Sequence, residues 1–444
     1  MRILIIAFHF PPDTEVGAIR PGEFARLLPA HGMETWVLSV EGGLAGQNRD
    51  DISVSDSACE RVLRASVGTT VSSRLLSFAL CLKRALHIPS SINGESIMPA
   101  NDGTPGTIDV SSKAHRVVGW LSYPDEYAGW YRSALKCAIR QHHKTPFDVI
   151  LSTSPPRVAH LIGHQLAMRY SLPWIMDMRD PWTMDWAPGL SDKRLKARYE
   201  ALFLLCGNRA DRIVTVTETL RQKLIRRHPA LADKIVTIPN GSTPRVATES
   251  TTNTSPSLFS IGYYGNLFGV RSCTIFFEGL KLWLDANPRE RARIRVRFFG
   301  YEFGDAAGQC TGAGLDDVVE FHQGVTRNEV FRLMRDDYGL LLIANNQPLQ
   351  VPAKLFDYLN SGRRILALTE PDSATAQAVR TIPGVATAQS PQELKAALDR
   401  FLGEFNRGEN AELDRAEILK EVSYERRAAR IAEIIADVRG LQTT

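Results

Sequence analysis

The chain has 444 residues, of which 44% are hydrophobic, and a formal net charge of +4. This length allows two domains of ordinary size, each with its own core. Because 53 lysines and arginines are nearly balanced by 49 aspartates and glutamates, the composition argues against a protein that coats nucleic acid.

The first half of the chain alternates short apolar runs with helical patterns. Such alternation is typical of a parallel sheet covered by helices. It predicts a first domain over residues 1–242. Its expected strands are Ile3–Ala7, Glu34–Ser39, Asp148–Ser152, Trp174–Asp177, Arg212–Val216 and Lys234–Ile238.

Residues from about 45 to 120 interrupt this pattern and are expected to form an insertion. Between Arg61 and Gly94 the chain has basic residues but no aspartate or glutamate. Within this stretch, apolar residues recur at helical spacing over 74–87. The resulting basic amphipathic helix could lie on an anionic membrane surface, or it could pack on its own domain. The sequence leaves both alternatives open.

A polar stretch rich in serine and threonine, from Ser242 to Ser257, separates the two halves and reads as a linker. The strand pattern then resumes and predicts a second domain over 258–422. Both sheets should bind ligands at the carboxyl ends of their strands. The expected strands are Ser260–Tyr264, Arg293–Phe299, Val318–His322, Gly339–Ala344, Ile365–Leu368 and Val385–Ala388.

The segment from Val351 to Leu368 predicts a binding site. A helix begins after Pro352 and ends at a Ser-Gly pair, and a strand follows at once. Backbone N–H groups at a helix start favour an anion, and Lys354 adds a full positive charge there. We therefore predict that a diphosphate lies at Lys354. Asp357, about one turn further on, could accept hydrogen bonds from ribose hydroxyls.

Several segments resemble the retaining glycosyltransferases of family 4, and they follow one another in the order expected of that family. They are Phe10 to Arg20, Phe147 to Pro156, Leu172 to Trp182, Ile235 to Gly241, Ile261 to Ser272 and Val351 to Tyr358. The resemblance implies an α/β protein of the GT-B type, in which two Rossmann-like, doubly wound parallel-sheet domains face a cleft. The first domain would bind the acceptor and the second the nucleotide sugar. The helix over 423–444 would cross back to the first domain.

The resemblance also implies roles for individual residues. Lys354 and Arg271 would stabilise the departing diphosphate, and Asp180, beside Arg179, would orient or deprotonate an acceptor hydroxyl. A loop ion pair is the structural alternative for Arg179 and Asp180. Seven further residues are predicted contacts. On the donor side, together with Asp357, they are Gly17, Gly265, Asn266, Gly300 and Pro352, and on the acceptor side they are Arg20 and Ser154.

Some positions depart from the family pattern or carry a structural explanation. The family has two glutamates separated by seven residues, but here Leu349 occupies the first position and Asp357 the second. His160 and His164 are four residues apart, as metal ligands on a helix can be. They lack a third ligand in the sequence, so we expect them to be structural.

The sequence therefore predicts a retaining glycosyltransferase (EC 2.4) that moves a sugar from a nucleoside-diphosphate sugar to a lipid-linked or soluble sugar acceptor. Cell-surface polysaccharide or glycolipid biosynthesis is the expected setting. No metal or cofactor is expected, since the chain has no Asp-x-Asp loop. Two alternatives stay open: a nucleotide-sugar epimerase on the same fold, and a non-catalytic nucleotide-sugar-binding subunit, for which Leu349 is the best support.

The location follows from what the sequence lacks. The first apolar run is too short for a signal peptide, and no run approaches the ~18 residues of a membrane span. The six cysteines include no C-x-x-C pair, which favours free thiols in a reducing compartment. We expect a cytoplasmic protein without nucleic-acid partners. Residues 74–87 could hold it on the inner face of the membrane.

Overall fold

The computed structural model describes residues 1–13, 15–41, 59, 61–68, 120, 123–182, 192–243, 258–267, 271–301, 303–409 and 412–440. These residues form two compact units, each built around one parallel sheet. The first unit comprises Met1–Val216, Lys223–Ile238 and Ala428–Thr444, and the second comprises Thr217–Gln222 and Pro239–Arg427. The helix expected over 74–87 lies outside the described residues.

The sheet of the first unit has seven strands in the order β3-β2-β1-β4-β5-β6-β7. All six strands predicted for this half are confirmed, and β3 is an additional edge strand from the predicted insertion. Strands β4 and β5 are buried along their whole length, including the polar residues Ser152, Thr153, Ser154 and Asp177 near their carboxyl ends. The strands are β1 (Arg2–Ile6), β2 (Glu34–Val40), β3 (Val62–Ala65), β4 (Val149–Ser154), β5 (Trp174–Met178), β6 (Arg212–Thr215) and β7 (Ile235–Thr237).

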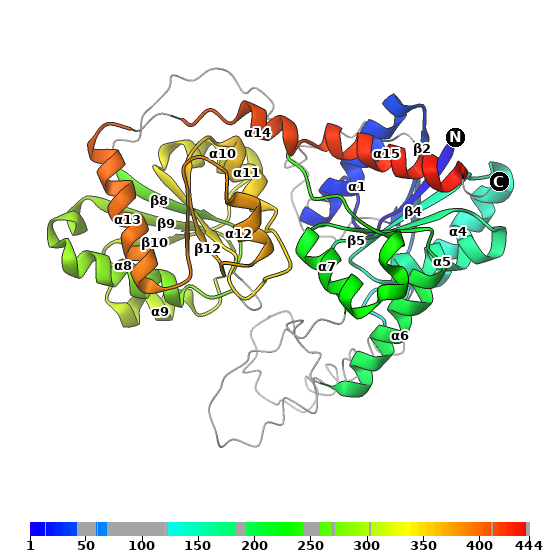
Figure 1. Cartoon of the computed structure of the whole chain (residues 1–444), viewed down its shortest axis with the longest axis horizontal. Helices are drawn as coiled ribbons and strands as arrows, with labels where there is room; N and C mark the ends of the chain where they lie inside the picture. The colour runs from blue at the N-terminus through cyan, green and yellow to red at the C-terminus, as the bar shows by residue number, and fades with distance from the viewer. Residues whose placement is uncertain are drawn as a thin grey trace, which may run out of the picture. The chain divides into compact units, whose positions relative to one another are not determined.

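Helices cover both faces of this sheet (Figure 1). They are α1 (Val16–Leu27), α4 (Trp130–Lys144), α5 (Val158–Tyr170), α6 (Lys193–Arg209), α7 (Glu218–Arg227) and α15 (Tyr424–Gly440). The last of these groups with the first unit from Ala428 onward. Its residues Ile431, Ile435 and Val438 are buried, and Arg439 lies 3.6 Å from the Asp148 carboxylate. Apolar burial, supported by this ion pair, therefore fixes α15 from Ala428 onward on the first unit.

The sheet of the second unit has six strands in the order β10-β9-β8-β11-β12-β13. All six predicted strands are confirmed: β8 (Phe259–Tyr264), β9 (Ile294–Phe299), β10 (Val319–His322), β11 (Gly339–Ile343), β12 (Arg364–Leu368) and β13 (Val385–Ala388). The helices are α8 (Thr274–Ala286), α9 (Ala306–Ala313), α10 (Arg327–Asp336), α11 (Lys354–Asn360), α12 (Ala374–Val379), α13 (Pro391–Asn406) and α14 (Ala416–Glu421).

Two apolar clusters cover this second sheet. One includes Trp283 of α8 and Phe401 of α13, which are both fully buried. The other includes Met334 of α10 and Leu355 of α11. Apolar side chains of the helices therefore cover the sheet of this unit, as expected for a doubly wound domain.

Each sheet has a point where the strand order reverses. In the first unit β1 lies between β2 and β4, and in the second β8 lies between β9 and β11. At such a point the loops that leave the carboxyl ends of the two strands diverge, and ligands of doubly wound proteins bind in the resulting crevice. The loops after β1, β4, β8 and β11 are therefore the places where a site is expected.

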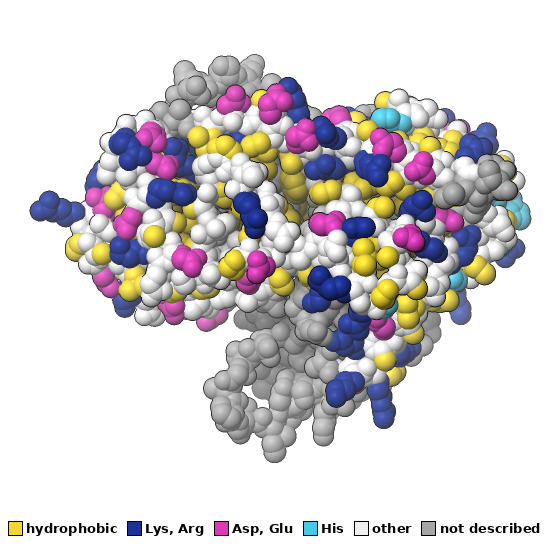
Figure 2. Space-filling model, viewed as in Figure 1, with side chains coloured by type: hydrophobic (Ala, Val, Ile, Leu, Met, Phe, Trp, Pro, Cys, Tyr) yellow, Lys and Arg dark blue, Asp and Glu magenta, His cyan; other side chains and the backbone are white. Residues whose placement is uncertain are grey.

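Charges are interspersed over the face of the molecule shown in Figure 2, with lysines and arginines among aspartates and glutamates. Basic residues are denser near the start of α6, whose sequence includes Lys193, Arg194, Lys196 and Arg198. Among the described helices, none combines the length and the apolar character that crossing a bilayer requires.

Candidate functional site

The loop after β8 brings a glycine against Lys354 of α11. Gly265 has a φ of +120°, a backbone conformation that suits glycine, and a Cβ there would overlap the Lys354 side chain. Lys354 Nζ donates a hydrogen bond of 2.7 Å to the Tyr263 hydroxyl and lies 3.4 Å from the Asn266 carbonyl oxygen. The predicted donor residues Gly265, Asn266 and Lys354 are thus brought together.

The charge of Lys354 is held in an environment that disfavours it. Burial and, to a lesser extent, the charge of Arg271 together lower the pKa of Lys354 to about 7, while the charge of Asp357 opposes the shift. Lys354 contacts Tyr263 at the end of β8, Arg271 contacts Gln347 on the loop that leads to α11, and the charge of Arg271 disfavours that of Lys354. A bound anion would relieve this repulsion, which makes the pair a candidate anion site.

Gly300 and Asn266 hold the segment after β8 against the segment after β9. A Cβ at Gly300 would collide with the Gly265 carbonyl oxygen, and the Asn266 side chain accepts a 2.8 Å hydrogen bond from the Tyr301 amide. Both residues thus have a structural reason for their identity. Any ligand contact they make would come in addition to it.

Asp357 has a partner that the sequence did not reveal. Its carboxylate accepts a 2.8 Å hydrogen bond from Arg327, and the two side chains keep 30% and 25% exposure. Burial raises the pKa of Asp357, against the opposing charges of Arg327 and Lys354. A ribose would therefore have to share this carboxylate with Arg327.

Arg327 left a weak signal in the sequence. It is the first residue of α10, directly after the N-cap Thr326. A cation at the N-terminal, positive end of a helix is electrostatically unfavourable. Arg327 at this position therefore indicates a partner outside the helix.

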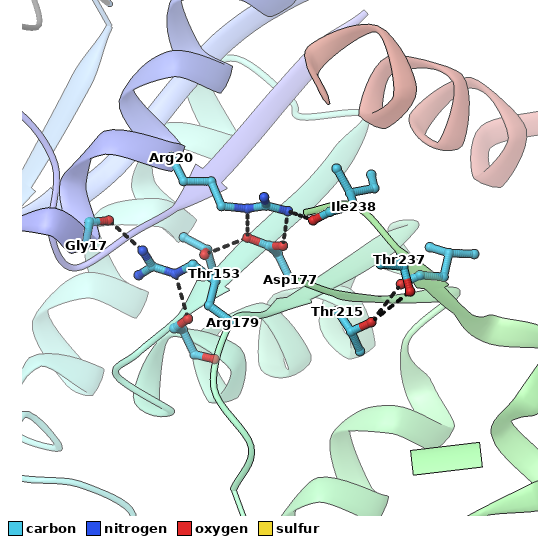
Figure 3. A network of polar contacts seen from close by, with 10 residues as sticks. Gly17, Arg20, Thr153, Asp177, Arg179, Thr215, Thr237 and Ile238 are labelled. Atoms are coloured by element: carbon cyan, nitrogen blue, oxygen red, sulfur yellow. Dashed lines mark hydrogen bonds and ion pairs between the residues drawn. The ribbon is translucent and has the colours of Figure 1, made fainter. Parts of the chain in front are cut away.

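Arg20, predicted on the acceptor side, lies inside the first unit instead (Figure 3). It is 1% exposed and forms two hydrogen bonds, of 3.0 and 2.8 Å, with the Asp177 carboxylate. It also donates to the Ile238 carbonyl, and Thr153 donates to Asp177. This pairing gives Arg20 a structural role, because the guanidinium is enclosed by the fold and joins α1 to the centre of the sheet; its part on the acceptor side stays a prediction.

Arg179 connects loops at the carboxyl edge of the same sheet (Figure 3). Its guanidinium donates to the carbonyl oxygens of Ser154, Gly17 and Pro155, at 2.8, 2.8 and 3.3 Å. An arginine stays protonated, so it does not act as a base. The structure indicates that Arg179 holds the end of β4, at Ser154, and the start of α1, at Gly17, in place.

The remaining two acceptor-side predictions differ in their surroundings. The Ser154 hydroxyl is buried without a hydrogen-bond partner among the described residues. Asp180 is partly exposed, and residues 183–191, which follow it closely in the sequence, lie outside the described residues. The part proposed for Asp180 in acceptor binding stays a prediction.

A histidine and an aspartate that sequence reasoning missed lie just after β1. His9 Nδ1 is 2.7 Å from Asp13 Oδ2, and the side chains are 13% and 5% exposed. Burial pushes the pKa of Asp13 up, but hydrogen bonds from His9 and the Glu15 amide, and the charges of His9 and Arg64, leave it below its usual value. A histidine oriented by a carboxylate can accept a proton from a hydroxyl. The two residues are four apart in the sequence, which is the signal that could have found them.

His160, which was predicted to be structural and not a metal ligand, packs in the core. Its Nδ1 lies 2.7 Å from the Ser152 hydroxyl, and burial lowers its pKa to about 3. A neutral, fully buried imidazole next to a serine fits the structural role expected for it.

Comparison with known proteins supports one domain family and one fold. Residues 97–241 match the family described as "Glycosyl transferase 4-like domain". No curated protein matches the chain. Sucrose-phosphate synthase from Thermosynechococcus elongatus superimposes with a TM-score of 0.62 at 13% identity, covering 99% of this chain and 100% of its own. Anabaena HepE in complex with UDP-glucose gives a TM-score of 0.61 at 12% identity over 98% and 100%. WaaG, a glycosyltransferase involved in lipopolysaccharide biosynthesis, gives 0.57 at 13% over 98% and 99%. These likenesses show that the two sheets form the GT-B fold.

Proposed function

We propose that this chain, a glycosyltransferase with a glycosyltransferase 4-like domain and the GT-B fold, transfers the sugar of a nucleoside-diphosphate sugar with retention of its anomeric configuration. The observation that carries the proposal is the pair of cations formed by Lys354 and Arg271. The pair lies where the loop after β8 meets the start of α11, at the reversal point of the second sheet. This is where a doubly wound domain binds a ligand.

The diphosphate is assigned to this pair of cations. During transfer, negative charge grows on the leaving diphosphate, and cations that are already in place stabilise it. Lys354 is held for this purpose by Tyr263 and by the space at Gly265. Binding of UDP-glucose by HepE, a protein of the same fold, supports a nucleotide sugar as the ligand class.

Retention is proposed from the resemblance to family 4. The leaving phosphate would accept the proton of the incoming hydroxyl on the same face of the sugar. In this scheme the residues of the first unit bind and orient the acceptor. Asp180 is assigned to the acceptor hydroxyl, and its neighbour Arg179 holds the end of β4 through the Ser154 carbonyl.

The acceptor is proposed to be a lipid-linked or soluble sugar of surface-polysaccharide or glycolipid biosynthesis. The involvement of WaaG in lipopolysaccharide biosynthesis supports this setting, because the two chains share their fold over nearly their whole lengths. A cytoplasmic protein that can touch the inner membrane face would meet such acceptors. The basic residues of 74–87 are the proposed contact.

His9 and Asp13 favour a second mechanism. If His9 takes the proton of the acceptor, the hydroxyl can attack from the side opposite the leaving group, and the product has the inverted configuration. The 2.7 Å contact between His9 and Asp13 is the specific observation in its support. The two mechanisms share the donor site and differ in the group that removes the proton.

Product analysis with a donor panel tests the proposed function. The full chain would be incubated with UDP-, GDP-, ADP- and dTDP-sugars and a mixture of simple sugar acceptors, and the products separated by chromatography. We expect one donor to yield a free nucleoside diphosphate and a glycosylated acceptor. An epimerised nucleotide sugar, or binding of a donor without any product, would contradict the proposal and favour an epimerase or a binding subunit.

A further inference from the structure

A polar cavity of about 230 Å³ opens at the carboxyl edge of the second sheet. The loops after β11, β12 and β13 and the residues before α8 line it. Its polar lining consists of hydroxyls, side-chain amides and one carboxylate, from Ser272, Asn345, Asn346, Thr369, Glu370 and Gln389. The volume is below the ~300 Å³ at which pockets for drug-sized ligands begin. It fits a ligand fragment such as one sugar ring better than a whole nucleotide.

One carboxylate oxygen of Glu370 accepts no hydrogen bond from the described residues. Its Oε1 accepts a 2.6 Å hydrogen bond from the backbone N–H of Asn346. Its Oε2 is buried and has no hydrogen-bond partner among the residues that the structure describes. A buried carboxylate oxygen without a donor is costly, so a ligand that donates a hydrogen bond there gains affinity.

The lining around Glu370 is held in a fixed conformation. Asn346 has a φ of +60°, which is strained for a residue with a side chain and is tolerated best by asparagine and aspartate. The Asn345 side chain accepts from the Ser272 amide at 3.3 Å and donates to the Ser272 carbonyl at 2.9 Å. Backbone strain and paired hydrogen bonds of this kind often mark a preorganised binding site.

The cavity also adjoins the proposed phosphate site. Ser272, in its lining, directly follows Arg271, whose guanidinium lies 3.5 Å from the Gln347 side chain on the same loop as Asn345 and Asn346. A group attached to a diphosphate at Arg271 would therefore be directed to this loop. Leu349, further along the loop, is 3% exposed and offers no polar group to such a ligand.

We propose that this cavity binds the transferred sugar of the donor and that Glu370 Oε2 accepts a hydrogen bond from one of its hydroxyls or from an acylamino N–H. The inference rests on the proposed function and adds the residue that distinguishes the intact donor from its nucleoside diphosphate. The recognised class is a sugar that presents a hydrogen-bond donor to the carboxylate. A sugar with a carboxylate of its own at that position would be repelled.

Calorimetry with two ligands tests the assignment. The probes are the nucleoside diphosphate and the nucleoside-diphosphate sugar that bind the wild type best among UDP, GDP, ADP and dTDP compounds. We expect Glu370→Gln to weaken the sugar donor roughly ten- to a hundredfold, the range of one hydrogen bond to a charged group. Its affinity for the nucleoside diphosphate should stay within about twofold.

Two further variants make the test specific. Ile275 is the apolar member of the cavity lining, so Ile275→Trp should fill the space and give the same selective loss of donor affinity. Glu417→Gln, at a carboxylate that is 85% exposed on α14, is the matched control and should change neither affinity. Thermal unfolding of each variant establishes that it is folded.

The outcomes separate this inference from the function on which it rests. A wild type that binds neither ligand overturns the proposed function and the inference together. A wild type that binds both, with Glu370→Gln and Ile275→Trp binding both equally well, overturns the inference alone. Equal weakening of the nucleoside diphosphate, or lost turnover with unchanged donor affinity, moves the cavity to the nucleotide or to the acceptor and also overturns it.

Discussion

Replacing Lys354 with alanine should weaken binding of the nucleoside-diphosphate sugar by roughly ten- to over a hundredfold, because a charge-assisted contact to phosphate contributes about 1.5–3 kcal/mol. Lys354 Nζ is anchored 2.7 Å from the Tyr263 hydroxyl, and a glycine makes room for its side chain. No other side chain on α11 carries a positive charge. Calorimetry of the folded variant measures the loss.

The pH dependence of binding gives this prediction a second readout. The free protein has a Lys354 pKa of about 7, lowered by burial and by Arg271. A bound diphosphate favours the charged amine and raises that pKa, so binding takes up a proton. Donor affinity should be highest below pH 7 and fall as the pH rises above it. The alanine variant should bind weakly and lose this dependence.

A control lysine lies in the same unit. Lys395 forms an exposed ion pair of 2.8 Å with Asp399 on α13, and Lys395→Ala should leave donor affinity unchanged. If Lys354→Ala binds as the wild type does, or keeps its pH dependence, Lys354 is not the phosphate ligand.

Replacing Arg20 with methionine should destabilise the first unit by about 3–5 kcal/mol, because Asp177 would keep a buried charge without its partner. Both side chains of this pair are 1% exposed. Because the chain has two compact units, one unfolding midpoint for the whole chain does not isolate the stability of the first unit. Hydrogen exchange of the amides of β1, β4 and β5 reports it directly.

Matched variants distinguish a structural from a binding role. Arg2 and Glu34 form a pair that is 43% and 34% exposed, so Arg2→Met should cost less than about 1 kcal/mol. Removing both partners, in Arg20→Met with Asp177→Leu, should recover part of the stability because no lone charge remains. An Arg20→Met protein with normal protection but no turnover would return Arg20 to the acceptor side.

The strands were predictable because the central strands of both sheets are buried on two faces, so their sequences contain short apolar runs such as that of Gly339–Ile343. Strand β3 was missed because it is a four-residue edge strand with only one fully buried residue. Its sequence therefore carries little of the apolar signal that identifies the central strands.

The site was less predictable, since its contacts join residues far apart in the chain. Lys354 could be found from its helix start alone. The role of Arg20 depends on Asp177, 157 residues away, and that of Asp357 on Arg327, 30 residues away. No local pattern reveals such partners. Glu370 looked like an ordinary loop residue, because the cavity and the carboxylate oxygen that no described residue pairs with exist only in the folded chain.

The stereochemistry of the product is the most direct test of the proposed mechanism. With the donor found in the panel, proton NMR early in the reaction gives the anomeric configuration of the transferred sugar before any rearrangement. We predict the same configuration in product and donor, for the wild type and for His9→Gln alike. An inverted product, formed by the wild type and lost in His9→Gln, would contradict retention and identify His9 as the base.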